Sequence, residues 1–249
     1  MNNKSPIGID RRIRLEWLEH IVELFDNGFS EPEISRALLN EVSGYLSVGK
    51  STVSRGSGEK AVSNLLKIWI RVPAFLLPLR DAGLKMFSEF PREHHIVLHW
   101  GMTIAVYPFW GFVAAQTGRL LKLQKIVTPV QVQRRMKEYY GERPTVKDAT
   151  RRALRSMGDW GVLKESSQKG VYLPGLSLSI SHPHLISWLI EATLHTRPNR
   201  SAPLKELIES TTLFPFRITP VTAESLATNS PRLEILRHNL DDVLMILRK

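Results

Sequence analysis

Three cationic side chains, Lys147, Arg151 and Arg155, recur every four residues in the segment TVKDATRRALRSMGDW, and Arg152 lies next to the second of them. Residues four apart share one face of an α-helix, so this segment predicts a helix with a strongly basic face. The opposite face is apolar, with Val146, Ala149, Ala153, Leu154 and Met157 at helical spacing. Lysine and arginine neutralise nucleic-acid phosphates, and arginine also recognises guanine in the major groove. The spacing therefore predicts a DNA-reading helix that packs through its apolar side.

The segments that precede this helix predict two further helices and a turn that would position it. An apolar helix is expected over 112–125, and Thr128-Pro129 is typical of a helix start, with threonine as the cap and proline in the first turn. Val130, Val132 and Met136 are then expected to supply the apolar contacts of this second helix. Gly141–Pro144 predicts a turn.

The basic helix itself is expected to begin at Thr145, as its cap, with Asp148 in the capping-box position. Trp160–Leu163 predicts a strand after it, Lys164–Gly170 a polar turn, and Val171–Leu173 a returning strand. Three helices followed by a hairpin are the order of a winged helix-turn-helix, which we expect over 112–175. The side chains expected to contact DNA are Lys147, Arg151, Arg152, Arg155, Arg134, Arg135, Lys164 and Lys169.

The overall charge favours the same partner. Lysine and arginine number 34 against 24 aspartates and glutamates, which gives a formal net charge of +10. Residues 119–172 contain 13 of the basic and 5 of the acidic side chains, so most of the excess lies in the predicted DNA-binding unit. A basic excess of this kind indicates a polyanionic partner.

A phosphate-binding loop is the main competing motif. Gly44–Ser51 matches the pattern GxxxxGK[ST], and Gly56–Ala61 is a weaker dinucleotide-like match. The phosphate loop requires a buried strand before it. Here a helical pattern over 34–42 precedes it, and the Gly- and Ser-rich residues 43–58 are expected to form a loop. No nucleotide or other cofactor is therefore expected, although basic groups in Lys50–Arg55 leave a second DNA contact open.

The histidines and carboxylates do not form a catalytic or metal-binding set by their spacing. His95 and His99 are four residues apart beside His94, but no nearby aspartate or cysteine completes a set of metal ligands. A core or helix-surface role is expected for them. His182 and His184 are expected in a loop, and Asp241-Asp242 in a solvated helical turn. We expect no enzymatic activity and no bound metal.

The first half of the chain predicts helices. Residues 11–27 are amphipathic and stop at Gly28, and Ser30 with Glu33 is typical of the start of a second helix. Further helices are expected over 59–70 and 74–88. Together these predict a helical domain over 1–111.

Residues 96–118 contain no lysine, arginine, aspartate or glutamate, which leaves a membrane-associated protein as an alternative. A pair of buried helices broken at Pro108 is the preferred interpretation. The first twelve residues lack the apolar stretch of a secretory signal, and cysteine is absent from the chain. The expected location is therefore the cytoplasm.

A small α/β domain is expected over 176–249. Strands are predicted at 176–180, 213–218 and 233–236, and helices at 184–196 and 204–211. A closing helix is expected over 240–247. The predicted fold is thus mostly α, with a helical N-terminal domain, a winged helix-turn-helix and this small α/β domain.

The chain resembles the BrxA accessory proteins of BREX bacteriophage-defence systems. The resemblance covers about residues 10–175 and depends on the helical first half, Tyr107-Pro108-Phe109, the basic helix Val146–Met157 and Trp160-Gly161-Val162-Leu163. It implies a winged-helix protein that binds double-stranded DNA without catalysis beside other defence proteins. The N-terminus lacks that family's opening rich in small residues, and 176–249 is an addition.

Four functions stay open from the sequence, and two of them are a membrane-associated protein, through residues 96–118, and a nucleotide-binding enzyme, through Gly44–Ser51; the other two are favoured over these. The first is a non-enzymatic double-stranded DNA-binding protein, as an accessory or regulatory component of phage defence. The second is an adaptor whose winged helix contacts a defence ATPase or methyltransferase. The sequence predicts neither the oligomeric state nor the DNA sequence preference.

Overall fold

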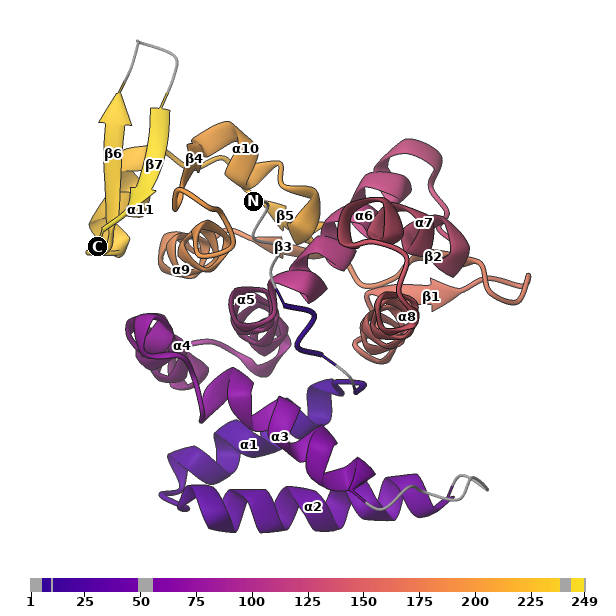
Figure 1. Ribbon diagram of the computed structural model, residues 1–249. Helices are drawn as coiled ribbons and strands as arrows, with labels where there is room; N and C mark the ends of the chain where they lie inside the picture. Colours follow the sequence, from indigo (N-terminus) through magenta and orange to yellow (C-terminus); the bar gives the residue numbers. More distant parts are fainter. Residues whose placement is uncertain (1–5, 10, 49–55, 238–242, 249) are drawn as a thin grey trace.

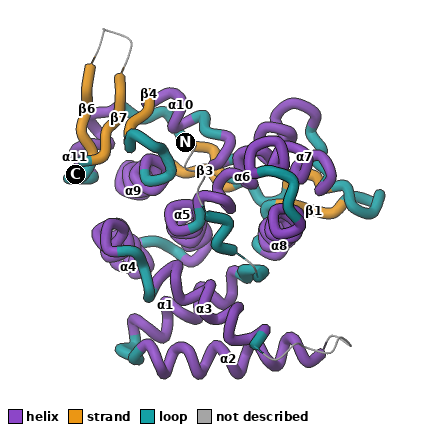
Figure 2. Tube along the Cα trace, in the orientation of Figure 1, coloured by secondary structure: helices purple, strands orange, loops and turns teal. Residues whose placement is uncertain are grey.

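The computed structural model describes residues 6–9, 11–48, 56–237 and 243–248. Its secondary structure is mostly helical, with 63% helix and 11% strand. Figure 1 shows α1–α3 at the bottom, α6–α8 with the β1–β2 hairpin on the right, and the C-terminal elements at the upper left, arranged around the central helix α5. Figure 2 shows the strands in orange, and among the described residues the first of them, β1, begins at Leu163.

The first half folds as three packed helices, as the amphipathic pattern predicts. They are α1 (Leu15–Asp26), α2 (Glu31–Val48) and α3 (Ser57–Trp69). Gly28 follows α1 with a φ of 80°, a left-handed conformation that glycine adopts without strain. Glu33 accepts hydrogen bonds from the backbone and hydroxyl of Ser30 at the start of α2. The prediction of a loop over 43–58 is wrong at both ends, because α2 continues to Val48 and α3 begins at Ser57.

A second layer contains the charge-free stretch. It comprises η1 (Ala74–Leu76), α4 (Leu77–Glu89), η2 (Arg92–His94), α5 (His95–Val106) and α6 (Pro108–Gln124). Ten consecutive residues of α5 are buried, so this helix is apolar because other helices surround it. The expected break at Pro108 is confirmed. No single helix among the described residues has the length and apolarity to cross a bilayer, and two helix pairs meet those criteria only with bends of 49° and 117°.

The third helix group leads into a hairpin. It contains α7 (Pro129–Tyr140) and α8 (Pro144–Asp159), followed by β1 (Leu163–Glu165) and β2 (Tyr172–Pro174). The two strands pair antiparallel, with Lys164 opposite Leu173. Val127 adds a third, single-residue bridge through mutual backbone hydrogen bonds with Tyr172.

The C-terminal part combines short helices with two small sheets. Its elements are β3 (Leu178–Ile180), α9 (Pro183–Leu194), β4 (Ser201–Pro203), α10 (Leu204–Ile208), η3 (Thr211–Leu213), β5 (Phe216–Ile218), α11 (Ala223–Asn229), β6 (Leu233–Arg237) and β7 (Val243–Leu247). β3 pairs parallel to β5, and β7 lies between β4 and β6 in an antiparallel sheet. The closing helix expected over 240–247 is wrong, because 243–247 is the central strand of this sheet. The Asp241-Asp242 prediction lies outside the described residues.

The C-terminal part shares its core with the helices of the first half. In α9, the Trp188 indole donates a hydrogen bond to the Leu79 carbonyl at 2.9 Å. The Trp100 indole in α5 donates to the Thr212 carbonyl at 3.1 Å. The buried apolar side chains form one cluster that includes members of α1, α5, α8 and α9. The N-terminal helices, the basic helix and the C-terminal part therefore pack around one continuous core.

Candidate nucleic-acid interface

The start of α7 is fixed by the capping residues that the sequence predicts. The Thr128 backbone donates to Gln131 Oε1 at 2.9 Å, and Thr128 Oγ1 accepts from the Gln131 backbone at 3.4 Å. These reciprocal bonds form a capping box, with Pro129 in the first turn. Val132 and Met136 are buried as expected, whereas the inward orientation expected for Val130 is wrong, because it is exposed. Gly141 then ends α7 with a φ of 90°.

The cap of the basic helix α8 lies two residues earlier than predicted. This cap is Arg143, whose side chain makes no capping hydrogen bond, and Pro144 occupies the first turn. Thr145 is therefore inside the helix, and Asp148 does not cap it. Proline explains the shift, since its fixed φ suits the first helical position and its missing N–H costs nothing there.

Helix α8 has the two faces that its sequence predicts. Its apolar side is buried and includes Val146, Ala149, Ala153, Leu154 and Met157. Lys147, Arg151 and Arg155 are exposed on the other side, and Arg152 is half-buried. The three exposed cations therefore lie along the outward surface of a helix whose inner side is fixed in the core.

The cations of α8 are mostly not neutralised within the chain. Arg151 Nη2 lies 3.1 Å from Asp148 Oδ1, and both side chains are about half exposed. An exposed ion pair of this kind contributes little to stability, so Arg151 can leave Asp148 and pair with a phosphate. Within the described ranges, Lys147 and Arg155 form no ion pair. This surface can therefore attract a polyanion without first breaking strong internal contacts.

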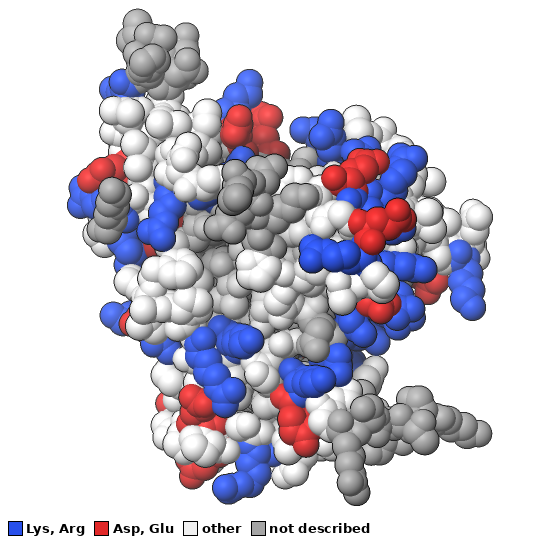
Figure 3. Space-filling model, in the orientation of Figure 1, with Lys and Arg blue, Asp and Glu red and all other residues white. Residues whose placement is uncertain are grey.

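The other predicted contact residues lie on α7 and the hairpin. Arg134 is exposed on α7, 3.8 Å from Glu138, and Arg135 is half-buried on the same helix. Lys164 lies on β1 and Lys169 in the turn between the strands, both exposed. Figure 3 shows blue side chains gathered over α7, α8 and the hairpin, with red ones among them. The structure thus places the predicted residues on two packed helices and the adjoining hairpin, with Arg135 and Arg152 partly buried.

A contact that the spacing could not reveal holds the end of α8. Arg12 forms a bidentate ion pair with Asp159 in the last turn. The backbone N–H of Ile13 donates to Ser156 Oγ at 2.9 Å, and the Trp160 indole donates to the Ile13 carbonyl at 3.0 Å. We call residues 9 and 11–13 the N-terminal strap. The basic face is thereby oriented by a segment more than 140 residues away in the sequence.

A second cluster of titratable groups lies between α1, α3 and α5. Glu19 Oε2 is 3.2 Å from His95 Nδ1, and Glu19 Oε1 is 3.2 Å from His99 Nε2. The Trp69 indole donates to His99 Nδ1 at 3.0 Å. His95 Nε2 also lies 3.2 Å from the Phe90 carbonyl. Sequence spacing suggested His95 and His99 as a pair but could not find Glu19, which is distant in the chain.

This cluster is built for structure more than for ligand binding. Because the Trp69 indole can only donate, neutral His99 has no proton on Nδ1 and carries it on Nε2, which lies 3.2 Å from Glu19 Oε1. Burial would raise the pKa of Glu19, but hydrogen bonds from His99 and His95 outweigh it and hold that pKa below its usual value. Burial lowers the pKa of His99. His99 is fully buried and its Nδ1 lone pair accepts from the Trp69 indole, so this ring does not offer that lone pair to a metal.

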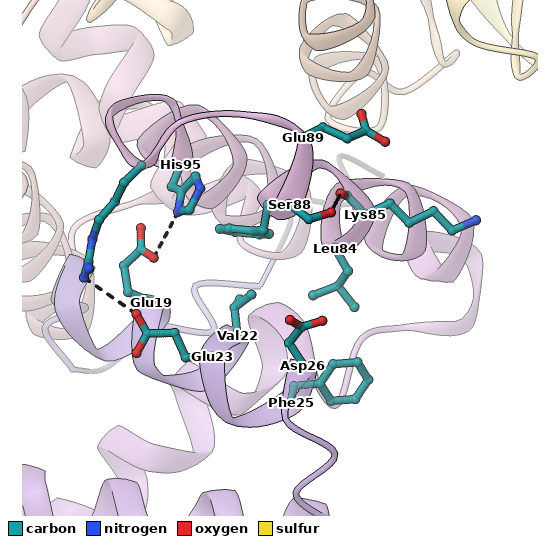
Figure 4. A pocket seen from close by; sticks show the side chains of 12 residues that line it. Glu19, Val22, Glu23, Phe25, Asp26, Leu84, Lys85, Ser88, Glu89 and His95 are labelled. Atoms are coloured by element: carbon teal, nitrogen blue, oxygen red, sulfur yellow. Dashed lines mark hydrogen bonds and ion pairs between the residues drawn. The ribbon is translucent and has the colours of Figure 1, made fainter.

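Glu19 and His95 also line a groove of about 770 Å³ between α1 and α4. Figure 4 shows their side chains together at one end of it, with Glu23 paired to the neighbouring arginine, Arg92. The walls are apolar at Val22 and Leu84. No group of three or more histidine, cysteine, aspartate or glutamate side chains suited to a metal occurs among residues with a described position.

The phosphate-loop match does not have the surroundings that phosphate binding requires. Its first five residues, 44–48, are the last turns of helix α2, and no strand precedes them. Residues 49–51, and the basic segment Lys50–Arg55, lie outside the described residues. His182 caps α9 and His184 lies in its first turn, so the loop expected for His184 is wrong.

Comparison with known proteins found no match to this chain among family models, curated proteins or solved structures.

Proposed function

We propose that this protein is a non-enzymatic double-stranded DNA-binding protein in which α6–α8 and the β1–β2 hairpin act as a winged helix-turn-helix. Helix α8 would lie in the major groove, with Lys147, Arg151 and Arg155 toward the DNA. Arg134 on α7 and Lys164 and Lys169 on the hairpin would contact the flanking backbone. The observation that carries the proposal is the exposure of three cations along one side of α8 while its other side is buried.

The order of the elements supports this proposal. Two helices joined by a short turn and followed by an antiparallel hairpin are the arrangement through which winged helices present a recognition helix. Lysine and arginine at this surface would provide affinity through phosphates, and arginine could add base preference. From the resemblance to BrxA proteins we further propose that this binding serves bacteriophage defence, with the protein as an accessory or regulatory component in the cytoplasm.

The test is duplex-DNA affinity, measured by fluorescence anisotropy over a series of salt concentrations. We expect binding to weaken steeply with salt, because contacts with phosphates release counterions. Arg151→Ala/Arg155→Ala should weaken binding by at least about tenfold and reduce the log–log salt slope by about 2, at roughly 0.9 per lost contact. Lys205→Ala/Arg217→Ala removes the same charge from exposed positions in the C-terminal part and serves as the control.

Two results would contradict the proposal. The first is wild-type protein that does not bind duplex DNA at low salt. The second is a folded Arg151→Ala/Arg155→Ala variant that binds as the control variant does. A complex with another protein that forms without DNA and is blocked by the same α8 variant would instead favour the adaptor function.

A further inference from the structure

The outer face of the β1–β2 hairpin carries a row of side chains, of which only Lys164 belongs to the proposed DNA contacts. Val127 pairs with Tyr172, so Ile126 and Leu173 are opposite one another on the adjacent strands. Leu173 in turn lies opposite Lys164 on β1. Since side chains alternate along strands, Val127 faces the core and Ile126, Leu173 and Lys164 face outward in one row. Val127 is fully buried, and Ile126 and Leu173 are 41% and 39% exposed.

Two more apolar side chains flank this row in the chain. Leu123 in the last turn of α6 and Val130 in the first turn of α7 are 70% and 73% exposed. We call Leu123, Ile126, Val130 and Leu173 the hairpin patch. Single exposed apolar residues are common, but a group on adjoining segments is typical of an interaction surface.

The charge around the hairpin patch limits what can cover it. Arg119, Lys122 and Lys125 are exposed on the segment that also carries Leu123 and Ile126, Lys164 lies opposite Leu173, and residues 119–130 include no aspartate or glutamate. Two copies joined face to face through the patch would bring these cations together, which opposes a symmetric dimer. A partner with acidic side chains is instead attracted by the same cations.

The backbone edge beside the patch is already occupied. The Ile126 carbonyl accepts from Gln124 Nε2 at 3.0 Å, and the Thr128 N–H donates to Gln131 Oε1 at 2.9 Å. An added strand would need these groups free for pairing. The partner must therefore contact the side-chain face, as an amphipathic helix does with residues spaced three and four apart.

We propose that the hairpin patch docks an amphipathic helix with acidic flanks from a partner protein. Leucine-type side chains of that helix contact Ile126 and Leu173, and its carboxylates face Lys122 and Lys125. The hairpin patch, Lys122 and Lys125 are not among the proposed DNA contacts, so peptide binding and duplex-DNA affinity can be measured separately. The proposal does not depend on DNA binding.

The test uses a fluorescein-labelled synthetic peptide of about 18 residues, or about five helical turns, with leucines at helical spacing and glutamates elsewhere. Anisotropy should report saturable binding to the wild-type protein and much weaker binding of a scrambled peptide of equal composition. Ile126→Ser/Leu173→Ser should weaken peptide binding at least about tenfold, as loss of two central anchors does. Leu236→Ser, which removes an exposed leucine from β6, is the matched control.

A second variant, with substitutions only at exposed lysines, distinguishes loss of peptide binding from a folding defect caused by the serine substitutions. Lys122→Glu/Lys125→Glu retains the apolar side chains and should also weaken peptide binding, with a smaller salt dependence. Equal binding of the scrambled peptide, or unchanged binding by both hairpin-patch variants, would overturn the proposal. Two further results would overturn it. One is binding of the wild-type protein, but not of the Ile126→Ser/Leu173→Ser variant, to anionic phospholipid vesicles. The other is a loss of duplex-DNA affinity in the same variant as large as its loss of peptide affinity.

Discussion

At the scale of single residues, His195 is held neutral by its surroundings. Burial, followed by the nearby charges of Arg200 and Arg232, lowers its pKa to about 4. Next to it, Glu191 is buried and accepts hydrogen bonds from Arg232 at 2.6 Å and Ser230 at 3.1 Å. A proton on His195 would add positive charge to a buried site where Arg232 already neutralises the carboxylate of Glu191.

The sign of the resulting pH dependence follows from these states. In the unfolded chain, histidine takes up its proton near pH 6.5, whereas folded His195 does so only near pH 4. The stability that it contributes is complete above pH 6.5 and is lost between pH 6.5 and 4, at no more than about 1.4 kcal/mol per pH unit. Burial of His99 acts in the same direction.

We therefore predict that the free energy of unfolding, measured by urea denaturation, declines as the pH falls from 7 to 4. His195→Gln removes the group that must take up the proton, so its decline should be shallower. His184→Gln, a surface histidine next to Glu89, is the control and should follow the wild type. A His195→Gln variant with the wild-type pH profile would show that His195 is not held neutral.

At the scale of elements, helix α9 lies against α4 and α5 because two glycines leave room for Trp188. A Cβ added at Gly101 would lie 2.3 Å from the Trp188 ring, and one at Gly83 would lie 2.9 Å from it. The same indole donates a hydrogen bond to the Leu79 carbonyl, which fixes its position. The ring therefore cannot move away without losing a buried hydrogen bond.

Gly101→Ala is expected to destabilise the protein by about 1–3 kcal/mol, the usual cost of overpacking a core. Gly158→Ala in α8 is the matched control, since nothing lies within 4 Å of its added Cβ. It should stabilise the protein by about 0.5–1 kcal/mol through helix propensity. Thermal unfolding of both variants tests this, and equal melting temperatures would contradict the close fit of α9.

The elements that sequence predicted well are those with local signals. Thr128-Pro129 and Pro108 predict helix starts because threonine caps helices and proline favours their first turn. The apolar and basic faces of α8 are predicted by the spacing of residues within that helix. The sequence predicts a helix at the strand β7 because a short apolar run is compatible with either a helix or a strand. Its secondary structure is determined by pairing with β4 and β6, which are separate segments of the chain. Glu19 and the Arg12–Asp159 pair could not be predicted, because each contact joins segments far apart in the chain.

At the scale of the whole molecule, the N-terminal strap connects the proposed DNA-binding helix to the helical first half. Ile9 and Ile13 are buried, Ile13 bonds to both Ser156 and Trp160, and Arg12 pairs with Asp159. The outward face of α8 is set by its own sequence, but its direction relative to the rest of the protein depends on these contacts. Arg12 is therefore expected to affect DNA binding by positioning α8.

If α8 binds DNA, Arg12→Ala should lower duplex affinity several-fold, because a less restrained helix must be ordered on binding. The log–log salt slope should stay at the wild-type value, since no phosphate contact is lost. Arg12→Lys should restore part of the affinity but not all of it, because lysine cannot make the bidentate contact with Asp159. A reduced salt slope in Arg12→Ala, like that expected for Arg151→Ala/Arg155→Ala, would instead make Arg12 a direct DNA contact. Unchanged affinity would show that α8 is held in place without the strap's ion pair.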